Sequence, residues 1–122
     1  MEMPEALGKL RTLVLAVDDL NAACAFYTDV LGFPLRFRDG DRWAQLDAGG
    51  IDIALAAGGE RPATGIALSL KVGDVAAALD RVRSGGGEVA GEPARGAPEI
   101  RASFTDRDGH LIYLYSSVEP PR

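Results

Sequence analysis

Residues 13–19, Leu-Val-Leu-Ala-Val-Asp-Asp, resemble residues 68–74, Leu-Ser-Leu-Lys-Val-Gly-Asp, at an offset of 55 positions. Farther along the chain, residues 47–53 match residues 106–112 at an offset of 59. The second copy is therefore longer by about four residues, which we place in a loop at Gly91–Pro98. Self-similarity at a fixed period predicts two copies of one structural unit.

Each copy has the pattern of a strand, a helix and three more strands. Leu13 and Leu15 alternate with Thr12 and Val14, and this period of two is typical of a strand with one face on a core. An aspartate that can cap a helix follows in both copies, at Asp19 and Asp74. We predict an α+β fold in one domain, residues 1–122, with unit one at about 10–57 and unit two at about 65–116.

Length, charge and cysteine usage exclude several classes of protein. The chain has 122 residues, a formal net charge of −5 and no basic run, so nucleic acid is disfavoured as a partner. It has no apolar run of about 18 residues that could span a membrane. Residues 1–10 lack the features of a signal peptide, and the single cysteine, Cys24, fits a reducing compartment. We expect a cytoplasmic protein with neither nucleic acid nor membrane as its partner.

Three stretches of sequence carry a family resemblance. Val17-Asp18-Asp19-Leu20 and Phe26-Tyr27-Thr28-Asp29-Val30-Leu31-Gly32-Phe33 lie early in the chain, and Asp106-Arg107-Asp108-Gly109-His110 lies late. Together with the repeat, they resemble the vicinal oxygen chelate superfamily of glyoxalases, bleomycin-resistance proteins and extradiol dioxygenases. The resemblance implies tandem βαβββ units that form a partly open, cup-shaped barrel with the helices outside. It implies no single chemistry, because the fold serves several functions.

The resemblance also implies where a metal would bind. Enzymes of the superfamily hold a divalent metal in the cup with His, Gln or Glu side chains from four strands. The matching positions here are Thr12, Ala54, Ala67 and Tyr113. Since none of these residues is a His, Gln or Glu, we expect no metal and no other cofactor.

Alternation along the strands predicts which side chains line the cup. Trp43 and Gln45 point inward if Ala44 and Leu46 face a helix, and aromatic rings with a few polar groups suit a flat ligand. A structural role for Trp43 is as well supported as ligand binding: the side chain could close one end of the barrel or pack in a dimer contact. The predicted ligand-binding residues are Thr12, Trp43, Gln45, Asp52, Ser69, Arg101, Ser103, Tyr113 and Tyr115.

Two reactive residue types occur once each. His110 could be a general base or a metal ligand, but its place beside Gly109 favours a turn residue that points away from the cup. Cys24 could be a nucleophile, but it falls on Leu79 of the second copy, which favours a side chain in the core. No residue is predicted to be catalytic.

Three functions are compatible with these features. We expect a metal-free protein of the bleomycin-resistance type, which binds a small aromatic or cationic molecule such as an antibiotic and works as a homodimer. The alternative is a glyoxalase-like enzyme (a lyase, isomerase or dioxygenase) with an unusual or metal-independent site. A third possibility is an accessory module whose cup is filled by its own side chains.

Overall fold

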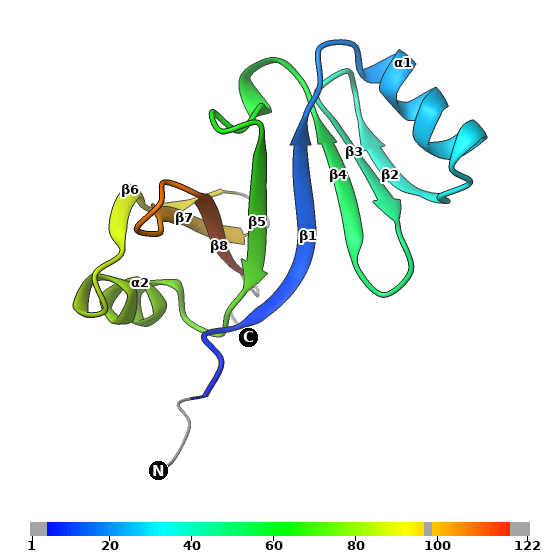
Figure 1. Ribbon diagram of the computed structural model, residues 1–122. Coiled ribbons are helices and arrows are strands. Elements are labelled where there is room, and N and C mark those ends of the chain that lie inside the picture. The colour runs from blue at the N-terminus through cyan, green and yellow to red at the C-terminus, as the bar shows by residue number, and fades with distance from the viewer. Residues whose placement is uncertain (1–4, 97–98, 118–122) are drawn as a thin grey trace. The chain divides into compact units, whose positions relative to one another are not determined.

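The computed structural model describes residues 5–96 and 99–117 (Figure 1). The chain divides into two compact units. The first unit is Arg11–Leu68, and the second is Ser69–Arg122 together with Met1–Leu10. Each unit contains one α-helix and a set of strands, so the predicted α+β fold class is confirmed.

The first unit holds most of strand β1 and the elements that follow it. They are β1 (Lys9–Ala16), α1 (Leu20–Ala25), the π-helical turn η1 (Phe26–Val30), β2 (Leu35–Asp39), β3 (Trp43–Asp47), β4 (Asp52–Ala56) and the 3₁₀ turn η2 (Gly58–Glu60). The strands lie in the order β2-β3-β4-β1. β1 and β4 are parallel, whereas β3 is antiparallel to both of its neighbours.

The second unit is built around the helix α2. Its elements are α2 (Val75–Ser84), β6 (Glu88–Arg95), β7 (Glu99–Thr105) and β8 (Leu111–Ser117), and β5 (Ile66–Lys71) has residues in both units. The strands β8-β7-β6 pair in that order and are antiparallel. The order of paired strands ends at β2 and at β6, so the mixed sheet is not closed.

Both α-helices are capped by the predicted aspartates, Asp19 and Asp74. An Oδ1 atom of Asp19 accepts a hydrogen bond from Ala22 N at 3.1 Å, and Asp74 Oδ1 accepts one from Ala77 N at 3.1 Å. These bonds satisfy backbone donors that have no partner within the first turn of a helix.

The first helix departs from a regular α-helix after Ala25. The Thr28 hydroxyl donates to the carbonyl oxygen of Cys24 at 2.8 Å, and Leu31 N bonds Phe26 O at 3.2 Å, five residues back. A threonine that bonds the carbonyl four residues earlier competes with the backbone ladder and bends a helix. The segment continues as the π-helical turn η1, which ends at Val30, and Gly32 follows with a φ of +78°.

Each unit has its own apolar core beneath its helix. In the first unit, Leu20 and Cys24 of α1 pack with Ala44, Leu46 and Leu55. The corresponding residues of the second unit are Val75, Ala78, Leu79, Ala102 and Leu114. Cys24 thus occupies the place that Leu79 has in the second unit, and its predicted role as a core side chain is confirmed.

The extra residues of the second copy form a strand where we expected a loop. β6 continues to Arg95 and pairs with β7, with shifts of register between Val89 and Gly91 and between Gly91 and Ala94. Bulges of this kind absorb additional residues while the strands stay paired. The predicted loop Gly91–Pro98 is therefore wrong as far as Arg95; residues 97–98 lie outside the described residues.

Candidate functional site

Strand β3 separates the core of the first unit from a polar face. Ala44 and Leu46 are fully buried in the core, whereas Trp43 and Gln45 point to the opposite side of the sheet and are half-buried. Trp43 lies opposite Ala56 on β4, and Gln45 lies opposite Ala54. Both of these neighbours on β4 are alanines and are fully buried.

The Gln45 amide is the centre of a hydrogen-bond network. Its Oε1 atom accepts from Trp43 Nε1 at 2.9 Å, and its Nε2 atom donates to Asp52 Oδ2 at 3.0 Å and to Thr12 Oγ1 at 3.2 Å. Arg36 Nε donates to the other oxygen of Asp52, Oδ1, at 2.7 Å. We call these five residues, Thr12, Arg36, Trp43, Gln45 and Asp52, the Gln45 network.

The partners of Gln45 permit only one orientation of its amide. An indole N–H can only donate, and an ionised carboxylate can only accept. The amide oxygen must therefore face Trp43, and the amide nitrogen must face Asp52. An amide that is held from both ends keeps the indole of Trp43 in one position.

Arg36 is the member of the network that is absent from the predicted ligand-binding residues. The register of β2 against β3 shifts between Leu35 and Phe37, and the Arg36 side chain reaches Asp52 and, at 3.4 Å, Asp47. The hydrogen bond to Asp52 and the negative charge of Asp47 raise the pKa of the Arg36 guanidinium. No alternation rule identifies this residue, since a bulge resets the face to which a side chain points.

The second unit brings another group of predicted residues onto one face. Arg101 pairs with Tyr115 across β7 and β8, and Ser103 pairs with Tyr113. Arg101, considered above as a polar contact for a ligand, forms an ion pair with Glu99 on its own strand. Ser69 on β5 is half-buried and alternates with Leu70, which packs on the core of the second unit.

His110 lies in the turn between β7 and β8, as predicted. Its backbone N–H donates to Asp106 Oδ1 at 2.9 Å, and its Nδ1 atom lies 2.9 Å from Asp106 Oδ2. The hydrogen bond and charge of Asp106 raise the pKa of His110, whereas the hydrogen bonds from His110 lower the pKa of Asp106. The side chain of His110 is 72% exposed, so this pair is a surface feature of the turn.

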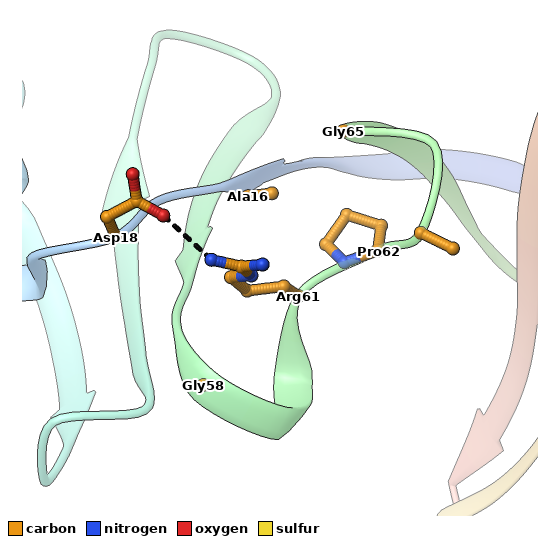
Figure 2. A pocket seen from close by; sticks show the side chains of 7 residues that line it. Ala16, Asp18, Gly58, Arg61, Pro62 and Gly65 are labelled. Carbon is orange, nitrogen blue, oxygen red and sulfur yellow. Dashed lines mark hydrogen bonds and ion pairs between the residues drawn. The ribbon is translucent and has the colours of Figure 1, made fainter.

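A shallow hollow of about 450 Å³ lies elsewhere in the first unit, next to η2 (Figure 2). An ion pair crosses it, with Arg61 Nη1 2.7 Å from Asp18 Oδ1. Its lining residues are Ala16, Asp18, Gly58, Arg61, Pro62, Ala63 and Gly65. Since Asp18 neutralises Arg61 and neither side chain is buried, the hollow offers little to hold a ligand.

Comparison with models of protein families shows to which superfamily the chain belongs. Residues 9–114 match the model of the Glyoxalase/Bleomycin resistance protein/Dioxygenase superfamily. The chain belongs to this superfamily. A relative from Mycolicibacterium smegmatis, described as an uncharacterized protein, is 34% identical over 112 residues, which are 91% of this chain and 96% of the relative.

Solved structures have the same fold. Methylmalonyl-CoA epimerase from Mycobacterium tuberculosis is 25% identical, with a TM-score of 0.73, and the match covers 97% of this chain and 94% of the epimerase. A superfamily member from Vibrio splendidus is 23% identical with a TM-score of 0.70, over 89% of this chain and 100% of that chain. Neither helix in the described part of the chain is long and apolar enough to span a membrane.

The four positions matched to the metal ligands of the superfamily do not fit a metal. Ala54 and Ala67 are buried and offer only methyl groups, while the Thr12 hydroxyl accepts from Gln45. A stable site for a transition metal needs imidazole, thiolate or carboxylate donors that converge on one point. Among residues 5–96 and 99–117, three such groups meet only at Asp106, Asp108 and His110, all exposed in the β7–β8 turn.

Proposed function

We propose that this superfamily member is a metal-free protein that binds a small molecule, and that its ligand lies against Trp43 in the first unit. The observation that carries the proposal is the Gln45 network. It holds a half-buried indole in place on the face of the sheet opposite the core. A ring held in this way loses little freedom when a flat ligand stacks on it, and stacking adds to the burial of apolar area.

The residues around Trp43 support a binding role. Gln45 and Asp52 provide polar atoms beside the indole, and Thr12 holds the Gln45 amide from below. Ser69, Arg101, Ser103, Tyr113 and Tyr115 are proposed as ligand contacts in the second unit. We further propose that the ligand is aromatic or cationic, as many antibiotics are, and that the protein is a cytoplasmic homodimer; sedimentation velocity tests the dimer.

Trp43 is the only tryptophan of the chain, so its fluorescence tests the proposal directly. Bleomycin is titrated into the purified protein, with Trp43 emission and the heat of binding measured in parallel. Saturable heat with a change of emission supports the proposal, and Trp43→Leu is expected to weaken binding at least about tenfold. Phe26→Leu, a change at an exposed aromatic residue of η1, is the matched control.

Two results contradict this function. One is the absence of both heat and emission change with bleomycin and with a panel of other aromatic and cationic antibiotics. The other is a stoichiometric amount of zinc, nickel, manganese or iron in protein that was purified without a chelator. The second result would show that donors other than the four matched positions hold a metal.

The second candidate function is an enzymatic one, and the similarity to methylmalonyl-CoA epimerase favours it. An epimerase removes and returns a proton next to a carbonyl group, and Asp52 is the carboxylate of the Gln45 network that could accept such a proton. The test is incubation of methylmalonyl-CoA with the protein in D₂O. Exchange of the α-proton for deuterium, detected by NMR and lost in Asp52→Asn, would support this function over simple binding.

A further inference from the structure

We propose that the Gln45 network recognises its ligand as a hydrogen-bond donor, and that it selects planar aromatic amines or amidines over aromatic carboxylates. The inference rests on the proposed function and adds the chemical class of the ligand. It follows from counting which donors and acceptors of the network are already used within the protein.

Trp43 has no hydrogen bond left to give. The indole Nε1–H is its only polar group, and this group already donates to Gln45 Oε1 at 2.9 Å. Trp43 can therefore offer a ligand the face of its ring and nothing else. Stacking on this face requires a planar ligand but does not distinguish a base from an acid.

The donors of Gln45 are used as well. Its two amide N–H groups face Asp52 Oδ2 and Thr12 Oγ1, while Oε1 accepts one bond among the residues that the structure describes, from Trp43. A carbonyl oxygen has two lone pairs, so Oε1 keeps one acceptor site. Thr12 contributes little to a ligand because the residue is only 5% exposed.

The charged groups beside the Gln45 amide also favour a ligand that donates hydrogen bonds, because they leave acceptor sites and negative charge unused. Arg36 lies between two carboxylates, Asp52 at 2.7 Å and Asp47 at 3.4 Å, so one negative charge is left over. Each oxygen of Asp52 accepts one bond within the network, yet a carboxylate oxygen can accept two. The Asp52 side chain is 20% exposed, and a ligand on the Trp43 face can therefore reach it.

An anionic ligand would meet the opposite situation. Within the Gln45 network, its carboxylate would approach Asp52 and Asp47 and would find the remaining N–H groups of Arg36 as donors. Repulsion from the second carboxylate opposes that approach, whereas an amino or amidine group is attracted and gains a charge-assisted hydrogen bond.

Three probes that share the bicyclic quinoline ring test the inference. 2-Aminoquinoline offers donors, quinoline offers only an acceptor, and quinoline-2-carboxylate is an anion. Each is titrated into the full chain by calorimetry, while the single indole N–H signal of Trp43 is followed in ¹H–¹⁵N spectra. We expect 2-aminoquinoline to bind at least about tenfold more tightly than quinoline-2-carboxylate, with quinoline between them.

Asp52→Asn is expected to weaken the binding of 2-aminoquinoline about tenfold and to narrow its advantage over the carboxylate. Asp80→Asn makes the same change of net charge on an exposed residue of α2 and is expected to leave both affinities unchanged. Equal effects of the two variants would show that net charge alone is sensed, and would overturn the inference.

The wild-type titrations are decisive even if Asp52→Asn does not fold. Equal affinity for the three probes, or preference for quinoline-2-carboxylate, would overturn the inference and leave the binding function in place. Failure of all three probes to shift the Trp43 signal would contradict both the inference and the binding of a flat ligand at this face.

Discussion

Trp43 and Gln45 bond to each other although they lie on the same strand, with Trp43 Nε1 donating to Gln45 Oε1 at 2.9 Å. Residues two positions apart on a strand point to the same side, so the contact is a direct consequence of strand geometry. The contact becomes specific because Asp52 on the neighbouring strand β4 holds the far end of the amide.

Gln45→Leu is expected to lower the free energy of unfolding by about 1 kcal/mol, because Trp43 Nε1–H and Asp52 both lose a partner at a half-buried position. Urea denaturation, monitored by circular dichroism, measures the change in the free energy of unfolding. Asn21→Leu, which replaces an exposed amide of α1 and removes its surface hydrogen bond from Arg38 Nη2, is the control and should stay within about 0.5 kcal/mol. Equal stabilities of Gln45→Leu and wild type would show that the network adds nothing to folding.

His110 is expected to titrate above its ordinary pKa, because its hydrogen bond to Asp106 favours the charged ring. A raised pKa means that the pair stabilises the fold fully below the pKa of the unfolded state, and that this stabilisation disappears as the pH rises through the folded pKa. The chain has one histidine, so a pH titration of its ring protons by NMR needs no assignment. Asp106→Asn should return the midpoint toward the ordinary value.

The pKa of Asp106 shifts in the opposite direction to that of His110. The hydrogen bonds from His110 lower its pKa, so its contribution to stability is present above the pKa of the unfolded carboxyl and is lost as the pH falls through the folded pKa. The difference in Tm between wild type and His110→Gln should therefore be largest in weakly acidic solution, at pH values between the titration of Asp106 and that of His110. A difference that does not change from pH 4 to pH 8 would contradict the coupling.

Leu79→Ala is expected to destabilise the chain by about 2–5 kcal/mol, because the residue is 1% exposed in the core of the second unit. Val30→Ala, at a position 67% exposed on η1, serves as the control and should change stability by less than about 0.5 kcal/mol. Chemical denaturation of both variants gives the comparison. A cost below about 1 kcal/mol for Leu79→Ala would mean that the core beneath α2 is loosely packed.

Gly8→Ala is expected to cost about 1–3 kcal/mol, because a Cβ atom there would lie 2.3 Å from Lys71 O and 2.7 Å from Val72 Cγ1. Backbone atoms cannot move away as a flexible side chain can, so the backbone at Gly8 or at Lys71 must shift. Gly73→Ala tests a nearby glycine whose Cβ would meet nothing within 4 Å, and it should be neutral or slightly stabilising. Thermal unfolding compares the two variants, and equal Tm values would contradict the close approach at Gly8.

Much of the fold could be predicted from local patterns. Asp19 and Asp74 cap their helices because a short acidic side chain before an amphipathic segment satisfies free N–H groups in any context. Cys24 and Leu79 could be placed in the two cores because the repeat aligns them. The π-helical turn at Phe26–Val30 could not be predicted, since it departs from the regular helix that the sequence pattern indicates.

The candidate site was predictable only in part. Alternation placed Trp43 and Gln45 on the same face, and Thr12 and Asp52 join them because β1 and β4 pair at that register. Arg36 could not be found, because a bulge between Leu35 and Phe37 turns it toward Asp52.

The sequence by itself determined the two similar units, the helix starts, the core positions and the absence of ligand side chains at the four matched metal positions. These properties depend on residue type and on spacing along one segment. Only the tertiary structure decided that Thr12, Arg36, Trp43, Gln45 and Asp52 form one network, because strand register and a bulge bring together residues that are far apart in the chain. The same contacts decided which hydrogen-bonding groups are used within the protein and which remain for a ligand.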